Sequence, residues 1–323
     1  MKSLYRWGLC FWIASISMSW SEGSIAVTPE LNTIVEGIKF SNSLVKSGMG
    51  HITVEYRYGT AYLLYADEHT DRLVKVEAFI AFEGSKVRLD RKKTFSKGNE
   101  SEVKTAFDGE KVMKLQSNPS GPIATILPST SIEPSELDPR WWGTSLPIVG
   151  QLSLADILGG IPIRRRIRTR SNYYTYYYIG DSVRVVGSED VNGEMCYVVD
   201  LNLKVCSENS DTTVAKYRLW INPAKGYMTS KIKATYTESI TWDLFSFREY
   251  PGAIWFVKKG IHRIYIVDKE TGEKELMTEA IVTLHDDFKV NIDVPDELFE
   301  LDFPEGLPVF DERTGKTLRW PGE

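Results

Sequence analysis

The chain has 323 residues and a formal net charge of −5. A mildly acidic chain is a poor candidate for general nucleic-acid binding, and this length is ample for one large hydrophobic core. Beyond the first 26 residues, no segment is apolar enough to span a bilayer.

The N-terminus has the pattern of a signal peptide. Two basic residues precede an uncharged and mostly apolar stretch at 7–20, and small residues follow at 24–26. The sequence therefore predicts a cleaved signal peptide over residues 1–26 and a single exported domain over residues 27–323. The alternative is an N-terminal membrane anchor, although the apolar stretch is shorter than the ~20 residues that a spanning helix needs.

A helix that leads directly into a strand is the first predicted structural unit. Apolar residues at positions 31, 34, 35 and 38 fall on one face of a helix, which Thr28 can cap and Gly48 can end in a left-handed turn. The period then changes to strict alternation over residues 51–58, which is typical of a half-buried strand. We therefore expect the helix to lie on the apolar face of a sheet.

Residues 74–92 continue the alternation, with a bend expected at Glu83-Gly84-Ser85. Alternate residues of a strand share one face of the sheet. The alternation therefore predicts an apolar face that lines a ligand site, formed by Ile52, Val54, Tyr56, Tyr58, Val76, Ile80, Phe82, Val87 and Leu89.

Asp108-Gly109 separates two short apolar runs and predicts a tight hairpin, because such a turn needs residues that accept a positive φ. A long proline-rich connection is then expected over residues 117–160. Within it, Ser153 and Asp156 form a candidate capping box for a short helix at 154–158. Such a connection is often functional, and the alternative is a loop that only packs over a sheet edge.

A basic run follows the connection and precedes a tyrosine-rich segment at 173–178. In an exported protein this run favours an anionic partner, either phospholipid head groups or an acidic protein surface. The alternative is the solvated edge of a strand. The residues of this candidate patch are Arg164, Arg165, Arg166, Arg168 and Arg170.

The C-terminal half predicts an antiparallel meander. Turn signals recur at Asn192-Gly193, at 222–226 and at Thr271-Gly272, with apolar strands between them. Cys196 and Cys206 flank one continuous strand, which would separate them by ~33 Å. A disulfide needs Cα atoms within ~7 Å, so we expect these two cysteines not to pair.

No motif for catalysis or metal binding is present. The four histidines are far apart in the sequence, and there is no HExxH, GxSxG or phosphate-binding loop. The sequence therefore predicts no metal site, no cofactor and no enzymatic activity. The run His285-Asp286-Asp287 is interpreted as a polar strand segment, with a catalytic cluster as the alternative.

Several stretches resemble the LolA/LolB-like superfamily of periplasmic outer-membrane lipoprotein carriers and receptors. The opening unit TPELNTIVEGIKFSNSLVKSGMGHITVEYRYG is similar to the family's first helix and strand. Further stretches similar to the family are GSKVRLDRKKTF, AFDGEKVMKL, KYRLWINPAKGYMTSKI and the tail VNIDVPDELFELDFPEGLPVFDERTG.

The resemblance implies a mainly β (α+β) fold. It consists of a curved antiparallel sheet that forms an unclosed half-barrel, covered by an N-terminal amphipathic helix and short helices. The implied function is that of a soluble periplasmic carrier. Such a carrier binds acyl chains of lipoproteins or phospholipids and sorts them to the outer membrane. Its partners would be an inner-membrane export complex or an outer-membrane receptor.

Two other classes compete with the carrier. The first is an envelope sensor or protein-interaction module on the same fold, which the basic run motivates. The second is an exported hydrolase, which would need an acid or a histidine at the cavity mouth. The sequence offers no such arrangement.

Overall fold

The computed structural model describes residues 29–59, 73–96, 98–117, 121–129, 138–142, 145–146, 152–168, 173–207, 210–236, 239–268 and 270–320. The predicted signal peptide and the Thr28 cap lie outside the described residues. No helix in this part of the chain is long and apolar enough to cross a membrane.

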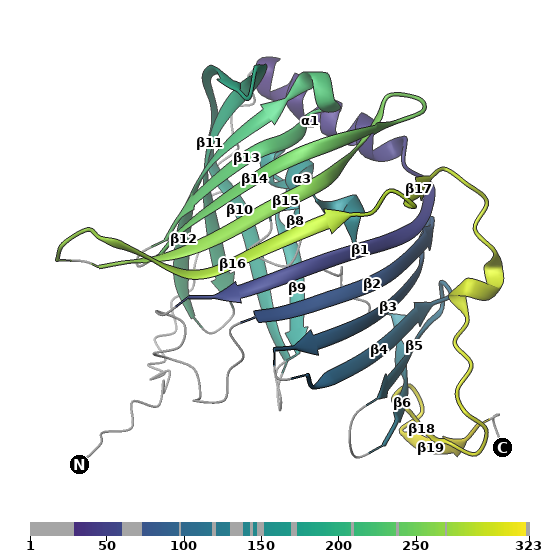
Figure 1. Cartoon of the computed structure of the whole chain (residues 1–323). Coiled ribbons are helices and arrows are strands. Elements are labelled where there is room, and N and C mark those ends of the chain that lie inside the picture. Colours follow the sequence, from purple (N-terminus) through teal and green to yellow (C-terminus); the bar gives the residue numbers. More distant parts are fainter. Residues whose placement is uncertain are drawn as a thin grey trace, which may run out of the picture.

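Seventeen of the described strands form one curved sheet, an unclosed half-barrel, which confirms the expected fold class (Figure 1). Neighbouring strands are antiparallel, except that β18 runs parallel to β6. In spatial order the sheet contains β9 (Ile163–Arg168), β10 (Tyr173–Val191), β11 (Glu194–Ser207), β12 (Ser210–Asn222), β13 (Met228–Thr235), β14 (Ser239–Tyr250), β15 (Ile254–Val267), β16 (Lys274–Leu284), β1 (Ser47–Tyr58), β2 (Leu73–Glu83), β3 (Lys86–Phe95), β4 (Glu100–Phe107), β5 (Lys111–Ser117), β6 (Ile123–Pro128), β18 (Pro308–Asp311) and β19 (Lys316–Arg319).

Three short strands complete the β structure. Strand β17 (Lys289–Val290) pairs with the start of β1, beside β16. The other two, β7 (Ser145–Leu146) and β8 (Leu152–Ser153), pair only with each other.

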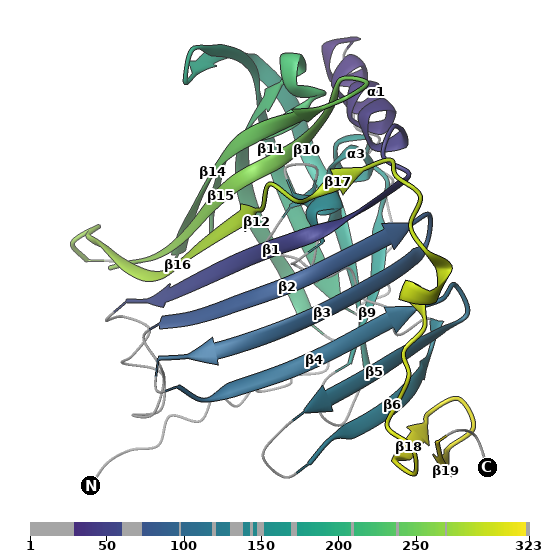
Figure 2. The same ribbon diagram turned by 45° about the vertical axis from the view of Figure 1, so that its right-hand side comes forward.

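Two helices lie on the same side of the sheet, at one end of the half-barrel (Figures 1 and 2). They are α1 (Pro29–Ser43) and α3 (Leu154–Leu158). Their apolar side chains pack together with those of β10–β13 in one buried cluster. We call the face of the sheet that these helices cover the inner face, and the opposite face the outer face. The helix and its placement agree with the 3.6-residue period of the sequence.

Helix α1 ends at Ser43, so the prediction that Gly48 terminates it is wrong. Gly48 lies inside β1, where an added Cβ would come within 2.9 Å of both the Lys289 carbonyl oxygen and the Phe82 ring. The helix end is held instead by Asn291. Its side chain accepts a hydrogen bond from the Lys46 N–H at 2.9 Å and donates one to the Leu44 carbonyl at 2.8 Å.

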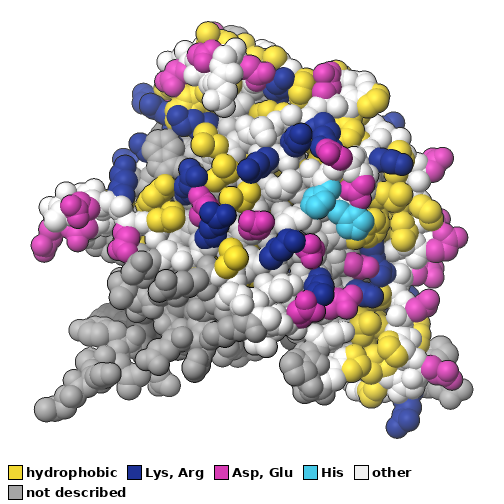
Figure 3. Space-filling model, viewed as in Figure 1, with side chains coloured by type: hydrophobic (Ala, Val, Ile, Leu, Met, Phe, Trp, Pro, Cys, Tyr) yellow, Lys and Arg dark blue, Asp and Glu magenta, His cyan; other side chains and the backbone are white. Residues whose placement is uncertain are grey.

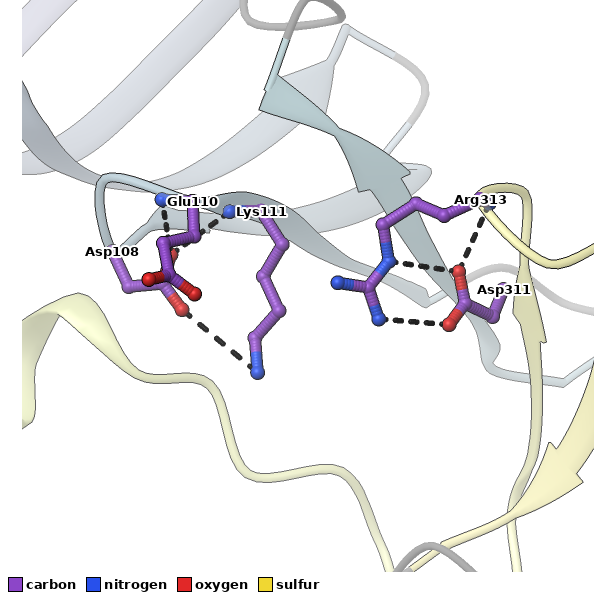
Figure 4. Close-up of polar contacts among 5 residues, drawn as sticks. All are labelled: Asp108, Glu110, Lys111, Asp311 and Arg313. Atoms are coloured by element: carbon purple, nitrogen blue, oxygen red, sulfur yellow. Dashed lines mark hydrogen bonds and ion pairs between the residues drawn. The ribbon is translucent and has the colours of Figure 1, made fainter.

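Residues 74–92 belong to two strands, β2 and β3, and not to one bent strand. The chain reverses at Gly84, whose φ of +55° suits a tight turn, and Phe82 then pairs with Val87. The hairpin at Asp108-Gly109 is confirmed. The Asp108 carboxylate accepts hydrogen bonds from the N–H groups of Glu110 and Lys111 at 2.8 and 2.9 Å (Figure 4).

The predicted hairpins of the C-terminal half are also present. Asn192 and Gly193 adopt positive φ angles between β10 and β11, and the short 3₁₀ helix η4 (Pro223–Lys225) joins β12 to β13. Cys196 and Cys206 lie on the single strand β11 and are not joined by a disulfide, as expected.

The interpretation of His285-Asp286-Asp287 as a strand segment is wrong, because these residues form a turn between β16 and β17. The turn is tied to neighbouring strands on the outer face. His285 lies 2.7 Å from the Thr53 hydroxyl, and Asp287 lies 2.5 Å from Nδ1 of His51. We therefore assign the turn a structural role in anchoring β17 beside β1.

The C-terminal segment covers the outer face of β2–β6. Phe299 of the 3₁₀ helix η5 (Asp296–Phe299) packs on Ala81, while Phe303 and Val309 pack in a cluster with Ala106. Its last turn is held by the Asp311 carboxylate, which accepts three hydrogen bonds from Arg313 at 2.8–3.0 Å (Figure 4). The C-terminal segment therefore lies on the outer face, opposite to the side that α1 and α3 cover.

Candidate ligand-binding face

The inner face is continuous across the half-barrel because the strand register keeps the same parity from strand to strand. Leu219 of β12 pairs with Ile232 of β13. Residues paired in this way form a row across the sheet, which continues through β14–β16 to Tyr56 and Val74. The complete row across eight strands is Leu219, Ile232, Asp243, His262, Ala280, Tyr56, Val74 and Phe95.

All nine residues that strand parity predicts as lining lie on this face and belong to one apolar cluster. Tyr56, Tyr58 and Val87 are partly buried and keep some surface exposed, and the rings of Tyr56 and Tyr58 stack with their centroids 6.4 Å apart. Their role as ligand contacts stays a prediction. The six buried members are Ile52, Val54, Val76, Ile80, Phe82 and Leu89.

The end of the inner face near α1 is filled by the protein's own side chains. Phe82, Phe256 and Phe288 are each at most 2% exposed, and the last two rings lie 5.6 Å apart. A pocket of about 230 Å³ opens beside them, between the end of α1, the 3₁₀ helix η2 (Pro139–Trp141) and the β14–β15 turn. Arg140 of η2 lies over the Phe82 ring at 4.4 Å.

The short helix α3 approaches the sheet closely because β10 has a glycine at the contact. An added Cβ at Gly180 would lie 2.3 Å from the carbonyl oxygen of Ile157. The capping box is confirmed in part, since the Ser153 hydroxyl accepts a hydrogen bond from the Asp156 N–H at 3.3 Å. Leu154, Ile157 and Leu158 are fully buried against the sheet, so α3 is a packed cover of the inner face.

A buried polar group interrupts the apolar inner face on β12–β15. Asp243 is 1% exposed and pairs with Nδ1 of His262, while its second carboxylate oxygen has no hydrogen-bond partner within the described structure. Burial raises the pKa of Asp243, and the His262 hydrogen bond only partly opposes this shift. Nearby, the Tyr217 and Tyr236 hydroxyls share a 2.7 Å hydrogen bond, and burial raises the pKa of Tyr217 to about 12.

Asp243→Asn is expected to change how stability depends on pH. Because the pKa of Asp243 is raised, the folded state binds more protons than the unfolded state above the ordinary value of 3.8. The wild type should therefore lose stability relative to Asp243→Asn as the pH rises from about 3.8 towards neutrality. Urea unfolding at several pH values measures this difference. Parallel stability profiles for the two proteins would contradict the raised pKa.

The basic run lies largely outside the described side chains. Residues 164–168 belong to β9, which pairs with β10 at one edge of the described sheet, and the Arg164 side chain is exposed. The side chains of Arg165, Arg166 and Arg168 and the whole of Arg170 are not described. The edge position agrees with the alternative of a solvated strand edge, and an anionic partner for the run stays a prediction.

A second concavity, of about 700 Å³, lies on the outer face over β10–β13. Its charged side chains are mostly basic: Arg184, Lys216, Arg218, Lys231 and Lys233, with Glu189 and Asp200 as the acids. The Arg218 guanidinium pairs with the Asp200 carboxylate at 2.7 Å and lowers the pKa of that carboxyl group. This groove is polar, in contrast to the inner face.

The sequence interpretation missed polar residues that share the inner face. Arg91 and Lys93 have the same parity as Val87 and Leu89, so the alternation itself could have identified them. Lys114 requires the register across the Asp108-Gly109 hairpin, and Asp243 requires the pairing of β14 with β15. Among the described residues, no three His, Cys, Asp or Glu side chains come together as metal ligands.

Comparison with known proteins gives little further information. No model of a known protein family matches the chain, and no curated protein sequence matches it. One similar solved structure is the crystal structure of the Mycobacterium tuberculosis lipoprotein LppX. It shares 8% sequence identity with a TM-score of 0.28, and the match covers 83% of this chain and 98% of that chain. At this identity and TM-score, the likeness says nothing about the function of this chain.

Proposed function

We propose that the protein is a non-enzymatic carrier that binds acyl chains on the inner face of its half-barrel. The observation that supports this proposal is the apolar cluster on the inner face of β1–β3, in which Tyr56, Tyr58 and Phe95 stay partly exposed at the end away from α1. Burying such surface against an acyl chain is favourable by about 25 cal/mol per Å² of apolar area.

In the carrier role, the ligand would be a phospholipid or a lipidated protein in the periplasm, on its way to the outer membrane. The predicted signal peptide and the resemblance of the sequence to lipoprotein carriers support this setting. An inner-membrane export complex and an outer-membrane receptor would then be the donor and the acceptor. The helices α1 and α3 would keep the apolar face covered at one end while the ligand occupies the other.

Native mass spectrometry of the protein purified without detergent is the first test. We expect added masses that resolve into phospholipid or acylated peptide. We also expect the protein to take up cis-parinaric acid, and the double variant Tyr56→Ser/Tyr58→Ser to bind it on the order of tenfold more weakly. The control is Leu73→Ser, which removes a half-exposed apolar side chain from the outer face of β2.

An envelope interaction module is the second candidate, and the basic groove of about 700 Å³ on the outer face favours it. A groove of this charge suits an acidic protein surface. Native mass spectrometry and uptake of cis-parinaric acid also distinguish the two candidate functions. A folded protein that carries no lipid and takes up no cis-parinaric acid would contradict the carrier and leave the interaction module.

A further inference from the structure

The inner face of β1–β6 carries three positive charges and no negative charge. Arg91 and Lys93 point to this face from β3, in register with Ala78 and Val76 of the lining strand β2. Lys114 points to it from β5, because Lys114 pairs with Thr105 and Thr105 pairs with Leu89. All three side chains are half-buried. We call Arg91, Lys93 and Lys114 the inner cations.

The acids of the same strands all have the opposite parity. They are Glu55, Glu77, Glu83, Asp90, Glu100 and Glu102, and every one of them lies on the outer face. Three of these acids pair with outer cations: Glu77 with Lys75 at 2.7 Å, Glu100 with Lys92 at 2.8 Å, and Glu102 with Lys104 at 3.3 Å. Figure 3 shows basic and acidic side chains interspersed over the outer face.

The inner cations have no such partners among the described residues. The Lys93 ammonium lies over the Phe95 ring at 4.8 Å, which is a stabilising contact but not an ion pair. Burial, together with the charge of Arg91, lowers the pKa of Lys114, whereas Glu100 raises the pKa of Lys92 on the outer face. Arg91 and Lys114 repel each other on this half-buried face, and Lys93 lies two residues from Arg91 on the same side of β3, so an anion bound beside these cations would be stabilised.

The position of the inner cations on the sheet determines how a bound amphiphile would be oriented. Towards α1, the same faces of β2–β5 continue with Phe82, Phe107 and Val112, which are buried at the filled end of the half-barrel. Across the sheet, the cations are bordered by Val74 and Val76 of β2, and beyond these residues lie the partly exposed rings of Tyr56 and Tyr58 on β1. An amphiphile can therefore place its chain on this partly exposed apolar part of the inner face and its head group against the cations.

We propose that Arg91, Lys93 and Lys114 bind the anionic head group of an amphiphilic ligand whose acyl chain lies on the apolar part of the inner face. This inference rests on the proposed carrier function and narrows its ligand to lipids with a net negative phosphate or carboxylate. A guanidinium and two ammonium groups suit such an anion because they supply charge-assisted hydrogen bonds from several directions.

Calorimetric titration with two lysophospholipids tests the proposal. Lyso-phosphatidylglycerol and lyso-phosphatidylcholine with the same myristoyl chain differ in net charge and not in the chain. The wild type should bind the anionic lipid at least roughly tenfold more tightly at low salt, and added salt should reduce the preference. The triple variant Arg91→Gln/Lys93→Gln/Lys114→Gln should bind both lipids with similar affinity.

The matched control is Lys75→Gln/Lys92→Gln/Lys104→Gln, which removes the same charge from the outer face of β2–β4 and should keep the preference. Circular dichroism checks that both triple variants are folded. Equal binding of the two lipids by the wild type, or an unchanged preference in the inner variant, would overturn this inference and leave the carrier function standing. Binding of neither lipid would overturn the carrier function itself.

Inorganic phosphate is the last probe in the same titration. If the wild type binds phosphate alone as tightly as lyso-phosphatidylglycerol, the site recognises a free anion and the head-group assignment is wrong. If phosphate binds far more weakly, the acyl chain contributes to affinity, as the proposal requires.

Discussion

Gly50→Ala is expected to destabilise the protein by more than about 3 kcal/mol. Gly50 lies in β1 with a φ of +155°, which L-residues rarely adopt. An added Cβ would come within 2.4 Å of the Phe288 Cα. Phe288 is 2% exposed, so its backbone has little room to move away. The measurement is the free energy of unfolding from urea denaturation.

Gly84→Ala is the matched control, because this residue also has a positive φ of +55° but has no atom within 4 Å of the added Cβ. Only the strain of an L-residue at positive φ then applies, and we expect a loss of about 1–2 kcal/mol in the free energy of unfolding. Equal losses in the two variants would show that the close contact with Phe288 contributes nothing. Strand β1 would then be free to separate from the segment that contains Phe288.

Phe256→Ala is expected to cost about 3–5 kcal/mol, because it removes a large side chain from the filled end of the half-barrel. Phe256 is 1% exposed, and its ring contacts those of Tyr250 and Phe288 at centroid distances of 5.8 and 5.6 Å. The surrounding strands belong to one continuous sheet, so we expect them to close the resulting cavity only partly. Urea denaturation again measures the loss.

Phe40→Ala serves as the control for Phe256→Ala, since Phe40 lies on α1 and is 65% exposed. The expected change is within about 0.5 kcal/mol. If Phe256→Ala lowered the free energy of unfolding equally little, the side chains at the filled end would be able to repack around the missing ring. The pocket of about 230 Å³ beside it would then be able to expand for a ligand.

The elements that the sequence predicts correctly depend on neighbouring residues. Helix α1 follows from four apolar residues on one face, and the turns at Asp108-Gly109 and Asn192-Gly193 follow from residues that accept positive φ. In each case the energetic preference is local, so a short window of sequence contains it.

The wrong predictions concern points where distant residues decide the structure. Asn291 holds the end of α1, although it is more than 240 residues away in sequence. The sequence pattern predicts that Gly48 ends the helix, but Gly48 lies in β1, where Phe82 and Lys289 pack against it. No local pattern places the buried Asp243 on the inner face, because its position follows from the pairing of β14 with β15.

For the candidate site, the sequence by itself determined which residues of β1–β3 share a face, because alternation along a strand fixes the side to which each side chain points. It thereby placed all nine predicted lining residues together, from Ile52 to Leu89. The tertiary structure decided what else shares that face. Alternation along β3 already places Arg91 and Lys93 on it, but only the register across β3–β5 brings Lys114 to the same face. Pairing between strands is a long-range property that no local pattern contains.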